Sequence, residues 1–379
     1  MSGVMPQTRD IAGPASSAYR VLYRFRDQSH GNYPAAGLIE VDGSLYGTTR
    51  FGGSNTGVVY RVTTNGAQSV LHRFGGSGDG QYPTAGLVDV GGTLYGTTSA
   101  GGASGDGTVY SITPSGEEKV LFSFGGPDGA KPWAPVINVN GTLYGTTDSG
   151  GAHRKGTVYS VNTKGVEKVL HSFAGPPTDG EFPIAGLINV NGTLYGTTQW
   201  GGNGCGVSHR CGAIFSITPS GEEKVVYSFG GPDGAFPHSS LIDVNGTLYG
   251  TTYGGGTYGD GTVYSITTQG KEGVLHDFGA ANDGMLPQAG VIDVNGKLYG
   301  TTAAGGGASK DCRIGSGCGT VYSVTMSGVE QVLHGFTGGS DGGYPVANLI
   351  HVKGTLYGTT ASPEVDMYDG ISTVFTLTP

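Results

Sequence analysis

The feature that most constrains the fold of this chain is a five-residue motif, Leu-Tyr-Gly-Thr-Thr, which occurs seven times in 379 residues. Self-similarity at a period near 50, without helical periodicity, is typical of β-propellers and other repetitive all-β folds. The sequence therefore predicts one large domain of seven similar units, rather than two or three ordinary domains. The leucines of the motif are Leu45, Leu94, Leu143, Leu194, Leu248, Leu298 and Leu356, at intervals of 49, 49, 51, 54, 50 and 58 residues.

Each copy divides into four predicted strands. In the second copy, residues 86–90 alternate apolar and polar side chains, and a Gly91-Gly92 turn follows. Most other copies have Asn-Gly or Asp-Gly at this turn, which is a strong hairpin signal. The motif forms the second strand, GTVYSIT the third and EEKVLFSF the fourth. Four antiparallel strands make the blade of a propeller.

The two ends of the chain predict how the ring closes. The C-terminus ends with STVFTLTP, which is the third strand of the seventh copy, and the missing fourth strand is found as YRVLYRF at Tyr19–Phe25. Pairing of these segments would leave no free sheet edge. We therefore predict an all-β, seven-bladed propeller over residues 19–379, preceded by a flexible lead-in over residues 1–18.

Composition narrows the range of partners. Glycine supplies 75 of the 379 residues, and because these glycines recur at fixed offsets they indicate turns rather than disorder. The net charge is −9 and no Lys/Arg cluster stands out, which argues against nucleic acid as a partner.

No apolar run approaches the length of a membrane span. The first 18 residues lack the pattern of a secretion signal, although a chain from which a signal had been removed would look the same. We expect a monomer.

The repeat resembles a known bacterial family. The segments YGTTSAGGASGDGTVYSITPSGEEKVLFSF and YGTTYGGGTYGDGTVYSIT are similar to the GloVer tandem repeat, named after Gloeobacter and Verrucomicrobia. The hallmarks of that repeat are YGTT, a loop rich in Gly-Gly, and GTV followed by an aromatic residue, and the likeness covers residues 19–379. The resemblance implies a propeller with blades similar to those of kelch repeats, in a family of exported or surface proteins without a settled function.

Variation among the copies indicates which face of the ring binds ligands. The turns after the first and third strands are short and uniform, whereas the loops between the second and third strands vary widely, as in FGGSNTG and WGGNGCGVSHRCG. Insertions confined to one face are typical of a binding face. Two rings of positions should overlook the channel there. The residues after the proline of each copy are Ala35, Thr84, Trp133, Ile184, His238, Gln288 and Val346, and those after YGTT are Arg50, Ser99, Asp148, Gln199, Tyr253, Ala303 and Ala361.

These rings contain the candidate site residues. Aromatic side chains mixed with polar ones suit a sugar or another small polar ligand. We predict ligand binding by Arg50, Trp133, Gln199, Trp200 and Gln288. We predict acid/base catalysis, if the protein is an enzyme, by the residues His238, Asp148 and Tyr253. For each of them a structural role, such as filling the channel, is the alternative.

No metal or cofactor site is predicted. The sequence has no P-loop, dinucleotide fingerprint, His-Glu-x-x-His motif or nucleophile elbow. Four fourth-strand histidines share one offset, but they fall in separate copies and aromatic residues replace them elsewhere, which indicates packing. A repeated aspartate in Asp-Gly-x-x-Pro is explained by hydrogen bonds within a turn. Repeated calcium sites are the alternative, although the aspartates do not have the spacing of a known calcium loop. The histidines are His72, His171, His276 and His334, and the aspartates are Asp79, Asp128, Asp179, Asp233, Asp283 and Asp341.

The four cysteines predict two local disulfides, Cys205–Cys211 and Cys312–Cys318. Each pair lies in one variable loop with five intervening residues, and the second cysteine of each pair stands just before the third strand. A crosslink would restrain these long loops. Zinc binding by the cysteines is one alternative, but two cysteines in each of two separate copies do not bring four ligands together. Free thiols in a cytoplasmic protein are the other alternative. Disulfides would favour an extracellular or periplasmic location.

Three functions follow as hypotheses. The first is a ligand-binding propeller that holds a carbohydrate or small polar ligand at the mouth of the channel, on the variable-loop face. The second is a cofactor-free lyase, hydrolase, isomerase or cyclase that uses acid/base residues on the same face. The third is a protein-interaction scaffold.

Overall fold

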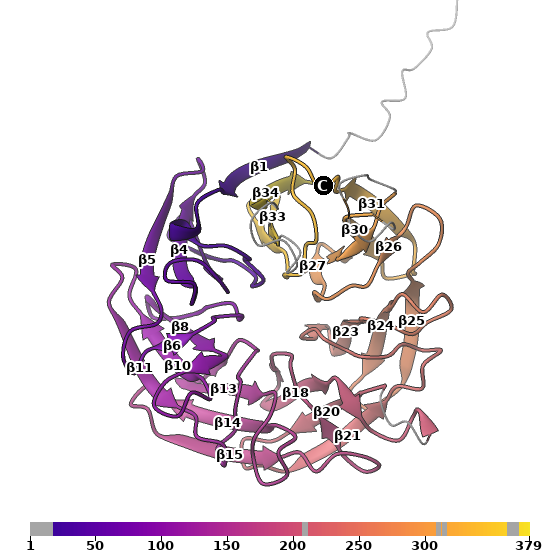
Figure 1. Ribbon diagram of the computed structural model, residues 1–379. Helices are drawn as coiled ribbons and strands as arrows, with labels where there is room; N and C mark the ends of the chain where they lie inside the picture. The colour runs from indigo at the N-terminus through magenta and orange to yellow at the C-terminus, as the bar shows by residue number, and fades with distance from the viewer. Residues whose placement is uncertain (1–17, 207–210, 308–311, 313–316, 362–370) are drawn as a thin grey trace, which may run out of the picture.

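Seven four-stranded antiparallel sheets surround a central axis and form a β-propeller (Figure 1). The computed structural model describes residues 18–206, 211–307, 312, 317–361 and 371–379. Within each blade the strands follow one another outward from the axis, as the sequence predicted, so the first strand lines the channel and the fourth forms the rim. The predicted fold class is confirmed.

The seven blades share one pattern of strand lengths, with a short innermost strand and longer outer ones. Blades 1 to 4 are β2 (Ile39–Val41), β3 (Ser44–Thr49), β4 (Val58–Thr63) and β5 (Gln68–Arg73); β7 (Val88–Val90), β8 (Thr93–Thr98), β10 (Thr108–Ile112) and β11 (Glu118–Ser123); β12 (Ile137–Val139), β13 (Thr142–Thr147), β14 (Thr157–Asn162) and β15 (Glu167–Ser172); β17 (Ile188–Val190), β18 (Thr193–Thr198), β20 (Ala213–Ile217) and β21 (Glu223–Ser228). Blades 5 to 7 are β22 (Ile242–Val244), β23 (Thr247–Thr252), β24 (Thr262–Thr267) and β25 (Glu272–Asp277); β27 (Ile292–Val294), β28 (Lys297–Thr302), β30 (Thr320–Thr325) and β31 (Glu330–Gly335); β32 (Ile350–Val352), β33 (Thr355–Thr360), β34 (Ser372–Thr378) and β1 (Ala18–Phe25).

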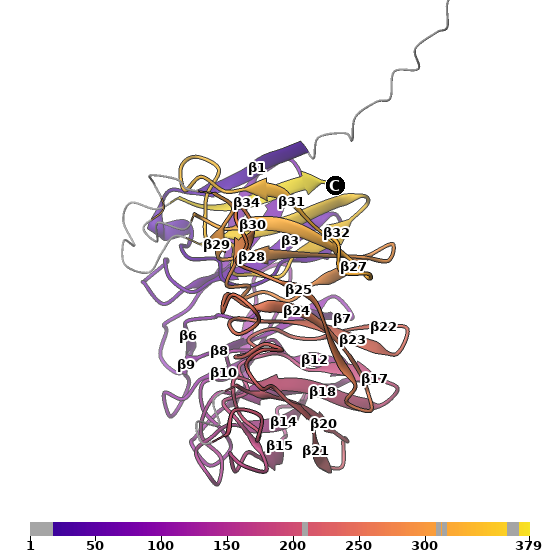
Figure 2. The same ribbon diagram turned by 90° about the vertical axis from the view of Figure 1, so that its right-hand side faces the viewer.

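The loops between second and third strands add small elements on one face of the ring. Three two-residue pairs join these loops to the segments that lead into the blades. In the edge-on view, β6, β9 and β29 lie toward one face, and the innermost strands extend toward the opposite face (Figure 2). The pairs are β6 (Gly80–Gln81) with β9 (Ala100–Gly101), β16 (Gly180–Glu181) with β19 (Trp200–Gly201), and β26 (Gly284–Met285) with β29 (Ala304–Gly305), and a 3-10 turn, η1 (Gln28–His30), follows β1.

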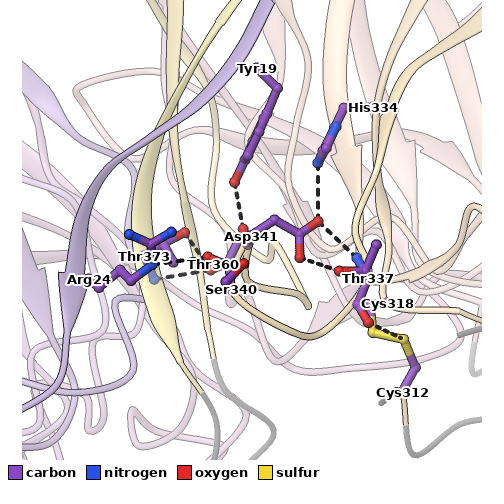
Figure 3. Close-up of polar contacts among 10 residues, drawn as sticks. All are labelled: Tyr19, Arg24, Cys312, Cys318, His334, Thr337, Ser340, Asp341, Thr360 and Thr373. Carbon is purple, nitrogen blue, oxygen red and sulfur yellow. Dashed lines mark hydrogen bonds and ion pairs between the residues drawn. A yellow bond between two sulfur atoms is a disulfide. The ribbon is translucent and has the colours of Figure 1, made fainter. Parts of the chain in front are cut away.

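The ring closes through the N-terminal strand, as predicted. β1 pairs antiparallel with β34, from Ala18 opposite Thr378 to Phe25 opposite Ser372. Side chains of β1 also reach blade 6: the Tyr19 hydroxyl donates to the carbonyl of Asp341 at 2.5 Å, and Arg24 Nε donates to the carbonyl of Ser340 at 3.0 Å (Figure 3). β1 begins at Ala18, one residue before the predicted start. The last residue of the predicted lead-in, Ala18, thus belongs to β1, and its other residues, 1–17, lie outside the described part of the chain.

The hydrophobic core lies between the blades. At each of the seven interfaces, a buried aromatic residue of the third strand meets, edge to face, a phenylalanine at the end of the preceding blade. Such pairs stabilise by about 0.5–1.5 kcal/mol beyond their burial. The pairs are Phe25–Tyr60, Phe74–Tyr110, Phe124–Tyr159, Phe173–Phe215, Phe229–Tyr264, Phe278–Tyr322 and Phe336–Phe375, with ring centroids 4.9 to 5.4 Å apart. The first pair joins the closing strand to blade 1.

Candidate functional site

A turn before the first strand of every blade positions the side chains at the mouth of the channel. In each copy the residue before the proline has a left-handed backbone, which is uncommon for residues other than glycine. Its carbonyl accepts a hydrogen bond from the residue after the Leu-Tyr-Gly-Thr-Thr motif, as in Asp148 N to Lys131 O and Gln199 N to Phe182 O, both at 3.0 Å. The two predicted rings are thereby tied together. The left-handed residues are Tyr33, Tyr82, Lys131, Phe182, Phe236, Leu286 and Tyr344, with φ between 55° and 61°.

The residues after the seven prolines surround one cavity of about 570 Å³. Its wall is completed by Tyr33 and by Arg50, Asp148 and Gln199 from the ring after YGTT. A second cavity of about 350 Å³ continues along the channel below it. Six of the eight predicted binding or catalytic residues therefore face one space: Arg50, Trp133, Asp148, Gln199, His238 and Gln288. Tyr33 was not predicted, although its fixed place before the proline of copy one was visible in the sequence.

Arg50 and Trp133 form a cationic and aromatic patch in this cavity. The guanidinium carbon of Arg50 lies 5.2 Å from the ring centroid of Trp133 and 5.2 Å from that of Phe51. These are cation–π distances. The Trp133 side chain is 37% exposed, so its indole keeps a surface that a ligand can contact.

His238 is held in its neutral form. Its ring stacks on Tyr253, with centroids 4.9 Å apart and planes at 7°, and its Nε2 lies 3.0 Å from Nε2 of Gln199. An amide nitrogen can only donate, so this contact assigns the lone pair to Nε2 and the proton to Nδ1. Burial lowers the pKa of His238 to about 4. Tyr253 does not line the cavity, and its contact with His238 is a supporting one.

The predicted acid/base pair shares the cavity without direct contact. Burial raises the pKa of the Asp148 carboxyl, while Lys131 and a hydrogen bond with Ser149 oppose this shift. Within the described residues, no hydrogen bond or ion pair joins Asp148 to His238. Trp200 lies away from the cavity: it pairs with Glu181 across β16 and β19 and packs edge-on against Phe182, at 5.2 Å between centroids.

Both predicted disulfides are present on the same face. Cys205 is bonded to Cys211 and Cys312 to Cys318, with Cα atoms 5.8 and 5.3 Å apart. Each bridge crosslinks the variable loop of its own blade, blade 4 or blade 6. Disulfides persist in oxidising compartments, so they support an extracellular or periplasmic location.

A pH dependence of stability follows from the buried imidazole. The pKa of His238 falls from 6.5 in the unfolded chain to about 4 in the folded one. Its contribution to stability is therefore complete above pH 6.5 and is lost as the pH falls toward 4. We expect His238→Asn to reduce the loss of unfolding free energy between pH 6.5 and 4, measured by urea denaturation. The same change at the exposed His153 is the control, and parallel profiles for His238→Asn and the unchanged protein would contradict the assignment.

The fourth-strand histidines have partners that the sequence did not reveal. They lie on separate blades, as expected, but each contacts the repeated aspartate that follows it, as in His72 Nε2 to Asp79 Oδ2 at 3.0 Å. A glutamate at the start of the next blade's fourth strand joins three of these pairs. The signal was the glutamate that stands at the start of that strand in five of the seven copies, visible only once neighbouring copies are set side by side.

Seven four-stranded blades around a mouth cavity define the chain as a β-propeller with a pocket on its variable-loop face. The model of the Gloeobacter/Verrucomicrobia repeat family matches residues 12–209 and 204–379, and the chain belongs to that family. No curated protein matches the chain in sequence. Among the described residues there is no helix with the length and apolar character that a membrane span needs.

Solved structures resemble the chain in fold at low sequence identity. A computationally designed protein, Ika8, aligns with a TM-score of 0.51 and 14% identity over 93% of this chain and 98% of that one. A putative 6-phosphogluconolactonase from Bacteroides uniformis aligns with a TM-score of 0.51 and 15% identity, over 83% and 88% of the two chains. A puromycin hydrolase has a TM-score of 0.55 and 14% identity over 92% of this chain, which spans only 54% of that one. These similarities concern the fold.

Proposed function

We propose that the protein binds a carbohydrate, or a small polar ligand of similar chemistry, in the cavity at the mouth of the channel. The observation that carries this proposal is the composition of its wall. One partly exposed indole, Trp133, stands among a guanidinium, a carboxylate and carboxamides in a space of about 570 Å³. Small-molecule sites commonly have volumes of about 300–1,000 Å³.

The wall offers both kinds of contact that a sugar requires. The apolar C–H face of a sugar ring packs against an aromatic ring, and Trp133 supplies this surface. Hydroxyl groups both donate and accept hydrogen bonds. Asp148 can accept from them, Arg50 can donate to them, and the amide of Gln288 can do both. The mixture of charges suits neutral sugars and, through Arg50, sugars that carry a carboxylate.

The two tryptophans of the chain allow a direct test of binding. Trp133 lines the cavity and Trp200 does not, so Trp200→Phe leaves Trp133, at the proposed site, as the single tryptophan of the chain, whose emission can be excited selectively. Titration of this variant with neutral hexoses, uronic acids and disaccharides is expected to change its emission with at least one sugar. Trp133→Ala should weaken that binding at least about fivefold in calorimetry, because loss of an aromatic anchor typically costs more than about 1 kcal/mol.

The control for this prediction is the calorimetric affinity of the Trp200→Phe variant, which should equal that of the unchanged protein. Equal affinity in Trp133→Ala would contradict the site. Absence of heat and of an emission change with every sugar tested would contradict the ligand class.

A cofactor-free enzyme is the second candidate. The observation that favours it is the pair of perturbed groups in one cavity, since burial raises the pKa of Asp148 and lowers that of His238 to about 4. A neutral imidazole and a carboxyl group that share one cavity are groups that can take up and release protons in catalysis. Glucono-δ-lactone is a suitable first substrate, because one protein of similar fold is described as a putative lactonase. Loss of turnover in His238→Asn with sugar binding retained would identify the enzyme.

A further inference from the structure

Three of the interfaces between neighbouring blades hold the same trio of a histidine, an aspartate and a glutamate. The histidine comes from the fourth strand of one blade, the aspartate from the turn after it, and the glutamate from the start of the next blade's fourth strand. In each trio, one ligand atom of each residue lies within 4.8 Å of the other two. The trios are His72–Asp79–Glu118, His171–Asp179–Glu223 and His276–Asp283–Glu330.

The aspartate of each trio is fixed by the backbone. Asp79 accepts hydrogen bonds from the N–H groups of Gly75 at 3.1 Å and Gly80 at 2.6 Å. Asp179 accepts from Ala174 at 2.7 Å and Gly180 at 2.7 Å. Because of these hydrogen bonds, the aspartate carboxylate already faces the imidazole, and the turn that carries the aspartate is held in place. Each aspartate oxygen nearest the histidine lies 3.0 or 3.1 Å from its Nε2.

We propose that each trio binds one divalent transition-metal ion, with Zn²⁺ as the best match, so that the chain holds three ions on the rim of the ring. One imidazole nitrogen and two carboxylate oxygens are a donor set that suits Zn²⁺, whereas Ca²⁺ and Mg²⁺ prefer oxygen donors alone. In a tetrahedral Zn²⁺ site the ligand atoms lie about 2.0–2.2 Å from the ion and therefore about 3.3–3.6 Å from one another. The histidine and aspartate atoms of each trio are in hydrogen-bonding contact at 3.0 or 3.1 Å, so they would have to separate only slightly to bind the same ion.

Charge and burial support this assignment. The histidine side chains of the trios are 18–22% exposed and the aspartate side chains 6–11%, and the glutamates are half-buried, so the aspartate of each trio is kept largely from water and the glutamate partly. Two adjacent carboxylates repel each other there, and a divalent ion would cancel their charge. Oε1 of Glu118, Glu223 and Glu330 is buried without a hydrogen-bond partner among the described residues, and the same holds for Glu167 and Glu272 at two other interfaces. The histidine is therefore the donor that distinguishes the trios from those two interfaces. The partial exposure of the histidines leaves a path for an ion and for a water ligand.

The other four interfaces supply natural comparisons, because each lacks at least one donor of the trio. We name each interface by the numbers of the two blades that form it. At the 2–3 interface a phenylalanine replaces the histidine. At the 4–5 interface Tyr227 replaces the histidine, and its hydroxyl donates a hydrogen bond to Asp233 at 2.5 Å. At the 6–7 interface Tyr19 replaces the glutamate and stacks on His334 at 3.8 Å. The equivalent sets are Phe122–Asp128–Glu167, Tyr227–Asp233–Glu272, His334–Asp341–Tyr19 and Tyr23–His30–Gln68. Only the 1–2, 3–4 and 5–6 interfaces are therefore proposed to bind the ion.

The test counts Zn²⁺ ions bound by the full chain. Protein stripped with a chelator is titrated with ZnCl₂ in a calorimeter, and bound metal is measured by elemental analysis after gel filtration. We expect three ions per chain. Glu118→Gln should retain two, and the triple variant Glu118→Gln/Glu223→Gln/Glu330→Gln should retain none. Glu167→Gln is the matched control, because it alters the same strand position opposite Phe122, and it should retain three.

A second variant and readout separate metal binding from folding. His72→Phe places a phenylalanine at the 1–2 interface, where the 2–3 interface already has Phe122. This variant is therefore expected to fold and to bind two ions. Saturating Zn²⁺ should raise the melting temperature of the unchanged protein and leave that of the triple variant unaltered. Absence of retained Zn²⁺ in the unchanged protein would overturn the proposal, and so would three retained ions in the triple variant.

Discussion

Deletion of residues 1–25 is expected to abolish the soluble monomer. β1 provides the outer strand of blade 7 and pairs along the whole of β34. Without it, the backbone groups on that edge of β34 lose their partners, and an unpaired edge is a template for association with other chains. The deletion also removes Phe25 from its contact with Tyr60, so the core between blades 7 and 1 opens at the same time.

Deletion of residues 1–17 is the control, since it ends one residue before β1. We expect this shorter deletion to leave the melting temperature and the elution volume unchanged, whereas the longer one gives aggregates or oligomers by gel filtration and loses the sharp thermal transition. A monomer with a normal melting temperature after removal of residues 1–25 would contradict ring closure by β1.

Gly156→Ala is expected to destabilise the protein by about 3 kcal/mol or more. Gly156 precedes the third strand of blade 3 and has φ of +96°, which is strained for alanine. A Cβ at this position would also meet the carbonyl oxygen of Thr147 and lie 2.5 Å from Cδ of Pro183, in the turn that leads into blade 4. The substitution would therefore force apart two blades as well as strain the backbone.

Gly141→Ala separates these two effects. Gly141 lies in a turn with φ of +83°, and a Cβ there would have no neighbour within 4 Å. Its substitution should cost only the backbone strain, about 1–2 kcal/mol. Urea denaturation of the two variants measures the difference, which reports the contact between blades 3 and 4. Equal losses in both variants would show that this contact does not contribute.

Local signals were sufficient to predict the blade from the sequence. Asn-Gly turns specify hairpins by themselves, and in the structure Asn140 and Gly141 both have positive φ, at 52° and 83°. Because the same strand pattern recurs seven times, the number of blades and the split last blade could be counted directly. The two disulfides were predictable for the same reason, since each closes a loop within one blade and places its cysteines only six positions apart.

The candidate site was predictable in its position but only partly in its members. A fixed offset from each proline identified the ring of residues at the mouth, because every blade repeats the same turn. Side-chain direction within a loop has no such period. Nothing in the sequence distinguished Gln199, whose amide reaches His238 at 3.0 Å, from its neighbour Trp200, which packs against Phe182 instead.

The sequence by itself determined the repeating unit, the number of copies, the closure of the ring and the face on which the loops vary, because each depends on contacts within one blade or on counting. Only the tertiary structure decided which residues of different blades meet. The trio of His72, Asp79 and Glu118 draws on two blades, and Arg50 of blade 1 reaches Trp133, which precedes the first strand of blade 3. Such contacts depend on the angle and spacing between blades, which the packing of the buried aromatic rings sets and which no single repeat encodes.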